Sequence, residues 1–88
     1  MPDIKALITS IVKPLLEYPE DFAIEVVDTD EFEEFHLLMN PEDIGRIIGR
    51  RGRVIRAIRT IIYSVRTQGR KRPRIVIPED GYDEFDEE

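Results

Sequence analysis

The sequence predicts one α+β domain in which three helices pack on one face of a three-stranded mixed sheet. Two observations support this prediction. Apolar residues recur at helical spacing in three segments. In two further segments they alternate with other residues, and in a third they form a short run before Pro78, as is typical of strands. A length of 88 residues fits a single domain with a small core. The predicted order is helix, strand, strand, helix, helix, strand over residues 1–78, followed by an acidic disordered tail over residues 79–88.

The first predicted helix covers residues 3–18. Its apolar residues recur every three or four positions, and Asp3 stands where a helix cap accepts a hydrogen bond from the backbone. Pro14 removes a backbone donor inside this segment. We therefore expect a kink near Ser10 or Ile11, or a break of the helix into two pieces.

Two alternating segments, over residues 22–26 and 35–39, predict a pair of neighbouring strands. Their connection is expected to be longer than a tight turn, because Glu33 and Glu34 are poor strand formers. Leu38 is expected to point outward and is a candidate association contact.

The second half of the chain predicts two helices and a last strand. Asn40 is a suitable cap for a helix over residues 41–48, which ends at Gly49. A longer helix follows over residues 53–67, with one apolar face and one arginine face. After a basic loop, residues 74–77 close the sheet as the third strand.

The net charge of −6 conceals three blocks of alternating sign. Residues 1–40 carry −8, residues 41–74 carry +9 and residues 75–88 carry −7. A basic block of this size is typical of a surface that binds a polyanion, although a solvated arginine face is the simpler alternative.

The centre of the basic block is the four-residue segment from Gly49 to Gly52, which lies between the last two predicted helices. Glycine adopts positive φ at little cost and lets a ligand approach the backbone N–H groups. Arg50 and Arg51 add positive charge, and a helix that begins at Arg53 adds the anion preference of its N-terminus. The segment therefore predicts a phosphate-binding turn, whereas a plain helical connection is the structural alternative.

This turn, its helices and the element order resemble a KH domain of the type II arrangement, over residues 3 to about 78. The signature is an apolar-Ile-Gly-x-x-Gly-x-x-Ile run, here Ile47-Ile48-Gly49-Arg50-Arg51-Gly52-Arg53-Val54-Ile55. The longer segment over residues 40–61 is similar to that of the small stand-alone bacterial KH proteins of the KhpA type.

The resemblance implies an RNA-binding protein that holds about four nucleotides of single-stranded RNA in a groove, with the glycine turn on the phosphate backbone. It also implies broad RNA specificity and a role as an RNA chaperone or post-transcriptional regulator. The last strand would form the opposite wall of the groove, and arginines of the long helix would extend the basic surface. The expected RNA-binding residues are Ile47, Ile48, Gly49, Arg50, Arg51, Gly52, Arg53, Ile55, Arg56, Arg59 and Arg74.

Other functional classes receive less support. The chain has no cysteine, and His36 is expected to be exposed without a metal partner, so no metal, cofactor or catalysis is expected. Glu33 and Glu34 are expected on a turn, where nothing holds them as a pair of catalytic carboxylates. No secretory leader or membrane span is recognisable, and we expect a cytoplasmic protein.

Two alternatives stay open. In the first, the basic helix docks an acidic partner; in the second, the chain binds DNA in the manner of a helix-turn-helix protein. The resemblance also implies a homodimer, or a heterodimer with a larger KH-containing RNA-binding protein. The opposite charges suggest that residues 79–88 fold over the basic helix and compete with RNA, while a tail that only increases solubility is the alternative.

Overall fold

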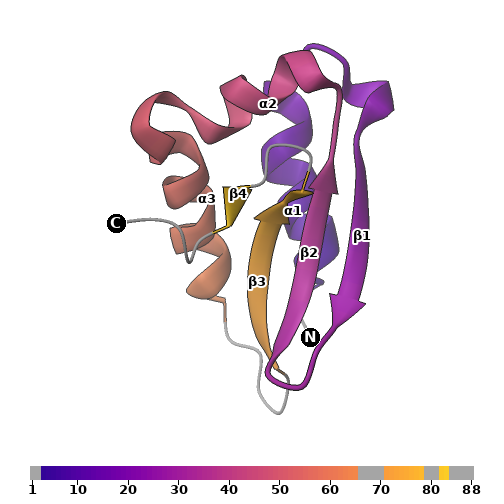
Figure 1. Cartoon of the computed structure of the whole chain (residues 1–88), viewed down its shortest axis with the longest axis vertical. Coiled ribbons are helices and arrows are strands. Elements are labelled where there is room, and N and C mark those ends of the chain that lie inside the picture. Colours follow the sequence, from indigo (N-terminus) through magenta and orange to yellow (C-terminus); the bar gives the residue numbers. More distant parts are fainter. Residues whose placement is uncertain (1–2, 66–70, 79–81, 84–88) are drawn as a thin grey trace.

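The computed structural model describes residues 3–65, 71–78 and 82–83. Within these residues, three α-helices, three short 3₁₀ helices and four strands follow one another (Figure 1). Their bounds are α1 Ile4–Val12, η1 Lys13–Leu15, η2 Pro19–Asp21, β1 Ala23–Asp28, β2 Phe32–Leu38, α2 Pro41–Ile48, η3 Arg50–Gly52, α3 Arg53–Tyr63, β3 Arg72–Ile77 and β4 Tyr82–Asp83.

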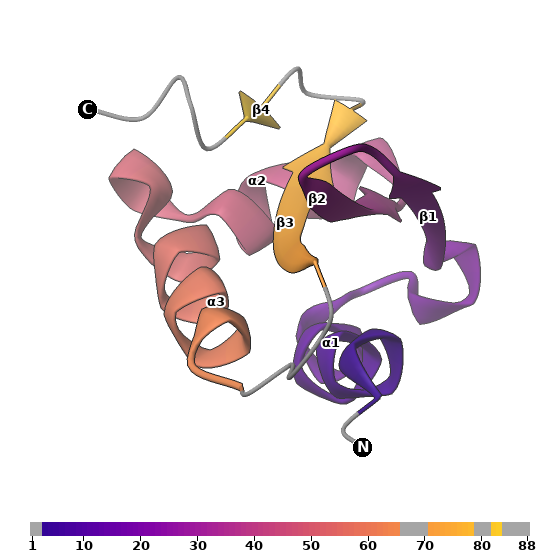
Figure 2. The same cartoon turned by 90° about the horizontal axis from the view of Figure 1, so that it is seen from below.

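The sheet has the order β1-β2-β3-β4. β2 is parallel to β3, whereas the other two pairs are antiparallel. Figure 2 shows α1 and α3 next to each other on one face of this sheet. The predicted α+β fold with a mixed sheet is therefore confirmed.

The two-residue strand β4 was not predicted. It lies within the segment that the sequence analysis assigned to a disordered tail, and it pairs with the end of β3. The remaining residues of that segment, 79–81 and 84–88, lie outside the described part of the chain.

The first helix has the predicted cap and the predicted break. The Asp3 carboxylate accepts a hydrogen bond from the N–H of Ala6 at 3.1 Å. The break comes after Val12, later than predicted, because helical bonds persist until the N–H of Lys13, which donates to Thr9. Pro14 is the first residue without a donor, and the chain there tightens into the 3₁₀ turn η1.

The connection between β1 and β2 is shorter than predicted. Residues 29–31 form the turn, and the hydroxyl of Thr29 accepts from the N–H of Phe32 at 2.9 Å. Glu33 and Glu34 lie inside β2, contrary to the expectation from their strand propensity. The ion pair of Glu34 with Arg74 favours Glu34 in the strand, whereas Glu33 lies opposite Asp28 of β1, a pairing of like charges that does not explain its place there.

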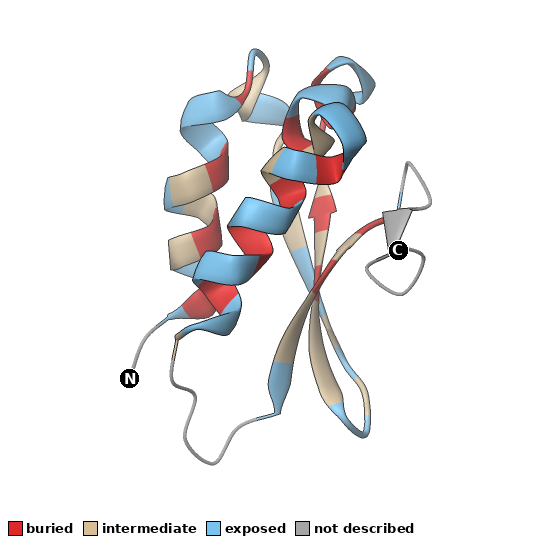
Figure 3. Cartoon of the chain, turned by 90° about the vertical axis from the view of Figure 1, so that its left-hand side faces the viewer, coloured by how far each residue is buried: buried red, intermediate tan, exposed pale blue. Residues whose placement is uncertain are grey.

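The core lies between the sheet and the helices, and the buried sides of the helices face inward in Figure 3. Phe35, Leu37 and Met39 are buried as predicted. Val26 is 42% exposed although it alternates like a core residue, because β1 is the outer strand of the sheet. The core is therefore concentrated beneath β2 and β3.

The second half follows the predicted order with shifted boundaries. α2 has the predicted bounds, while α3 ends at Tyr63 and the predicted helical residues 66 and 67 lie outside the described chain. β3 begins at Arg72, two residues earlier than predicted. Near this point the Lys71 ammonium lies 3.0 Å from the Asp28 carboxylate, which joins the start of β3 to the end of β1.

Candidate nucleic-acid interface

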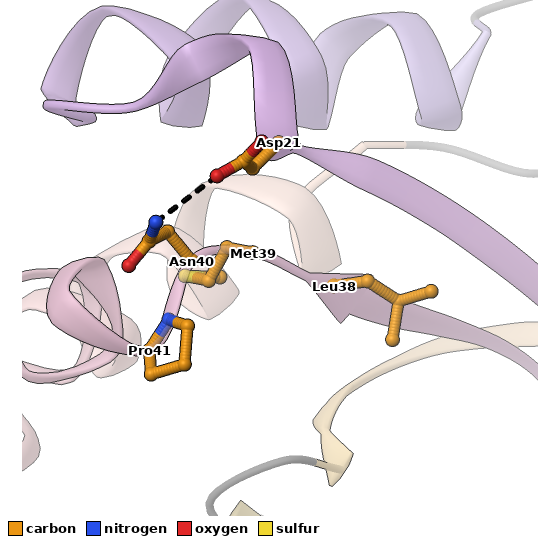
Figure 4. A pocket seen from close by; sticks show the side chains of 5 residues that line it. All are labelled: Asp21, Leu38, Met39, Asn40 and Pro41. Carbon is orange, nitrogen blue, oxygen red and sulfur yellow. Dashed lines mark hydrogen bonds between the residues drawn. The ribbon is translucent and has the colours of Figure 1, made fainter.

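The first end of α2 is closed by hydrogen bonds from side chains. The Asn40 amide oxygen accepts from the N–H of Glu42 at 2.9 Å, as the predicted cap requires. The Asn40 amide nitrogen donates to the Asp21 carboxylate at 3.0 Å (Figure 4). Pro41 occupies the first helical position, where no backbone donor is needed.

Asp43 fixes the same end of α2 to the connection that follows α1. Its side chain is fully buried, and its two carboxylate oxygens accept from the N–H groups of Glu17 at 2.9 Å and Tyr18 at 3.0 Å. In the sequence, Asp43 is recognisable only as an acid in the first turn of α2, where it suits the positive end of the helix dipole. No sequence signal identifies this clamp, because the two donors belong to a distant, irregular part of the chain.

The other end of α2 leads into a four-residue loop with unusual backbone angles. Gly49, Arg51 and Gly52 have φ of +76°, +57° and +75°, in the region where only glycine is comfortable. The N–H of Gly49 donates to the carbonyl of Gly45 at 2.8 Å, and that of Gly52 donates to Gly49 at 3.1 Å. The loop is thus a compact turn, as the two glycines predicted.

Gly49 is required for space as well as for conformation. A Cβ atom at this position would lie 2.9 Å from the backbone nitrogen of Val54 and 2.5 Å from Cγ2 of the same residue. Its ψ of 172° combined with φ of +76° also belongs to a region that is essentially restricted to glycine. The start of α3 therefore packs directly on the loop backbone.

Two backbone donors of the loop remain available. Within the described residues, the structure gives no hydrogen-bond partner to the N–H groups of Arg50 and Arg51. Gly52 precedes α3 and supplies no side-chain cap to it. The positive end of α3 and two unused donors therefore come together at one exposed turn, which is an arrangement suited to an anion.

The arginines of this turn face solvent. Arg50, Arg51 and Arg53 are exposed, and no carboxylate of the described residues forms an ion pair with them. The exposed Arg56 donates from its guanidinium to the Arg51 carbonyl, and so links the first turns of α3 to the loop. These four residues are called the arginine loop surface below.

Two other arginines differ from those of the arginine loop surface: the exposed Arg46 forms ion pairs, and Arg59 is buried. Arg46 lies 3.8 Å from the Asp43 carboxylate and 3.7 Å from that of Glu17. Arg59 was expected on the basic surface, but it is only 8% exposed. Its burial separates it from the exposed arginine loop surface.

Arg74 also lies in a different environment from the one expected. Its guanidinium is 3.0 Å from the Glu34 carboxylate and lies 5.7 Å from the ring centre of Phe32. Arg74 alternates with the buried Ile75, so its side chain is on the sheet face opposite the core. The cross-strand pair with Glu34 offsets its charge, so the backbone of β3 is the better candidate for the groove wall.

The three isoleucines expected to line the groove differ in burial. Ile47 and Ile55 are fully buried and belong to the core, whereas Ile48 is half-buried beside the loop. Only Ile48 therefore offers apolar surface next to Gly49 without leaving the core.

A separate open pocket of about 500 Å³ lies at the other end of α2 (Figure 4). It contains none of the expected RNA-binding residues. Leu38 is half-buried at its edge rather than fully outward, and the polar groups of Asp21 and Asn40 bind each other. His36, expected to be exposed, is half-buried and lies 2.9 Å from the Glu34 carboxylate.

The described residues lack two features. None of their helices has the length and apolar character needed to cross a lipid bilayer. No group of three or more acidic or histidine side chains is arranged to hold a metal ion in that part of the chain.

Comparison with known proteins identifies the family. The model of the KhpA/KhpB KH domain matches residues 5–77. The chain belongs to this family. The KhpA/KhpB match spans α1 to β3 and includes the whole loop, which confirms the resemblance seen in the sequence.

Several curated KhpA proteins are similar over most of their length. A protein named RNA-binding protein KhpA from Lactiplantibacillus plantarum is 58% identical, covering 92% of this chain and 94% of that protein. Proteins of the same name from Streptococcus pneumoniae and Listeria monocytogenes are 53% and 45% identical, covering 90% and 83% of this chain and 99% and 96% of their own lengths. No solved structure gave a significant match.

Proposed function

We propose that this chain binds single-stranded RNA, with the loop from Gly49 to Gly52 on the phosphate backbone. The observation that carries the proposal is the pair of unused N–H groups at Arg50 and Arg51, framed by exposed arginines. Membership of the KhpA/KhpB family and the printed names of the relatives give independent support. The protein acts by binding and is not an enzyme.

In this proposal the backbone and the side chains have different tasks. The N–H groups of Arg50 and Arg51 donate directly to phosphate oxygens, which Gly49 permits because it adds no side chain at the turn. The guanidinium groups of Arg50, Arg51 and Arg53 add charge-assisted hydrogen bonds and release counterions from the RNA. Arg56 holds the loop in shape through the Arg51 carbonyl.

The bases lie between Ile48 and the backbone of β3. Ile48 supplies a half-buried apolar contact, while the side chain of Arg74 remains paired with Glu34. Phosphate contacts carry little base information, so the protein binds many RNA sequences. Such broad binding suits an RNA chaperone or post-transcriptional regulator in the cytoplasm.

Association with a second KH protein is compatible with this function. α3 exposes Ile61, which is 47% accessible on the helix side away from the core. One exposed apolar side chain does not define an interface, so the homodimer, or the heterodimer with a larger KH-containing protein, rests on the family resemblance. Ile61 is not part of the arginine loop surface, so a contact made through it would leave that surface free for RNA.

The test is a binding titration with labelled single-stranded RNA, single-stranded DNA and duplex DNA across a salt series. The variant Arg50→Asp/Arg51→Asp reverses the loop charge, and aspartate tolerates the positive φ at position 51. We expect RNA to bind best. The plot of log K against log salt has a negative slope, and its magnitude should decrease by about 1.4 in the variant. Each phosphate contact to a single strand contributes about 0.7, and the variant loses two such contacts.

The matched control is Lys5→Asp/Lys13→Asp, which makes the same charge change at two exposed positions distant from the loop in sequence. If the control weakens binding as much as the loop variant, a diffuse charge effect replaces the proposed contact. Preference for duplex DNA would favour the helix-turn-helix alternative. A folded parent that binds no nucleic acid would leave the protein-interaction alternative.

A further inference from the structure

The strand β4 occupies an edge of β3 that would otherwise be open. Asp83 pairs with Val76 and Tyr82 pairs with Ile77 in antiparallel register. β2 already occupies the opposite edge of β3, so β4 completes the pairing at this end of the strand. A strand edge of this kind presents backbone donors and acceptors that any extended ligand can use.

This edge belongs to the part of the fold that carries the proposed RNA site. α3 packs against β3, and the hydroxyl of Tyr63 accepts from the N–H of Ile75 at 3.3 Å. In Figure 1, β4 lies beside β3 on the side away from β1, and Figure 2 shows it past α2, on the opposite side of the sheet from α1. β4 is therefore placed where the proposed function requires the groove wall to be free.

The sequence around β4 has the charge of a nucleic-acid backbone. Residues 79–88 contain seven acidic residues and no basic residue. The arginine loop surface contains four exposed arginines. RNA would use the backbone of β3 as one wall of the groove, and its negative charge would be attracted to the arginine loop surface. The segment around β4 shares both properties, because it pairs with β3 and is strongly acidic.

We infer that β4 is an internal competitor of RNA, which must leave the edge of β3 before RNA occupies the groove. This inference rests on the proposed function. A strand of only two residues forms a weak pairing that a ligand can displace. If β4 is paired in about nine molecules of ten, the apparent dissociation constant for RNA is raised about tenfold.

The sequence offers a closely matched pair of variants. Tyr82→Pro/Asp83→Pro removes both backbone donors of β4, whereas Phe85→Pro/Asp86→Pro makes the same kind of change three residues later. Each variant replaces one aromatic residue and one aspartate, so both lose the same charge. Any difference between them therefore reports on pairing at β4 and not on the charge of the segment.

The experiment measures the affinity of the full chain for a labelled 12-nucleotide single-stranded RNA at low salt. We expect Tyr82→Pro/Asp83→Pro to bind about ten times more tightly than Phe85→Pro/Asp86→Pro, which should resemble the parent. Removal of residues 79–88 should tighten binding at least as much, with a smaller gain at high salt because the acidic charges are then screened. Equal affinities of the parent and all three variants would overturn the inference while leaving the proposed function intact.

Hydrogen–deuterium exchange of residues 72–77 without RNA tests the pairing separately. We expect faster exchange in Tyr82→Pro/Asp83→Pro than in the parent or the control variant, because the edge of β3 becomes open to water. Identical exchange in all three proteins would show that β4 does not protect this edge and would overturn the inference. If neither the parent nor any variant binds RNA, the proposed function fails and the inhibitory role fails with it.

Discussion

The two ends of α2 differ in how their polar groups are satisfied. At its first end, Asn40 and Asp43 accept three backbone N–H groups between them, two of which come from outside the helix. At its second end, two N–H groups of the loop have no partner within the described residues. The first end therefore holds the fold together, whereas the second end leaves two backbone donors without a partner in the described part of the chain.

The largest expected loss of stability comes from a substitution at the first end of α2. Asp43→Ala leaves two partly buried backbone donors without an acceptor and empties a fully buried position, so we expect the free energy of unfolding to fall by about 3 kcal/mol. Urea denaturation measures the loss. The control is Glu42→Ala, an exposed acid in the same turn, which should change stability by less than about 0.5 kcal/mol. Equal losses in the two variants would mean that Asp43 acts only through the helix dipole.

A second prediction contrasts two glycines of this segment. Gly49→Ala combines positive φ with contact against the Val54 backbone, so it should lower the free energy of unfolding by about 2–3 kcal/mol. Gly45→Ala adds a methyl group with no atom within 4 Å in the interior of α2, and should raise it by about 0.5–1 kcal/mol. Thermal or urea unfolding compares the two. Changes of the same sign would contradict the special role of Gly49.

The smallest expected change concerns Arg51, the one described residue other than glycine with positive φ. Arg51→Gly removes the steric cost of that conformation but adds chain entropy to the unfolded state, so stability should rise by no more than about 1 kcal/mol. RNA affinity should nevertheless fall, because a guanidinium is lost from the loop. A clear loss of stability would show that the Arg51 side chain supports the fold instead of the ligand.

Much of the loop segment could be predicted from the sequence because its signals are local. The cap, the proline and the final glycine define α2 within a few residues, and the two glycines define the turn. The partners of Asp43, Glu34 and Arg74 were not predicted, because each is supplied by a segment distant in sequence.

The same reason explains why the candidate site was predicted only in part. Arginine spacing along a helix indicates a basic face, but it does not show that Arg59 is buried or that the charge of Arg74 is offset by Glu34. Charge composition indicated an acidic tail, yet it carried no signal for the backbone pairing of β4 with β3. Local patterns thus predicted the elements and the loop, while long-range contacts decided which charges remain available.

The parallel pairing of β2 with β3 has a consequence for how the protein folds. Phe35 and Ile75 are partners in that register, and the entire segment from α2 to α3 is the connection between them. A contact between such distant residues closes a large loop of chain, which makes it a slow step in folding. The hydrogen bonds within the glycine loop are local, but the loop lies inside this connection, so its position relative to β3 is fixed only once the two strands have paired.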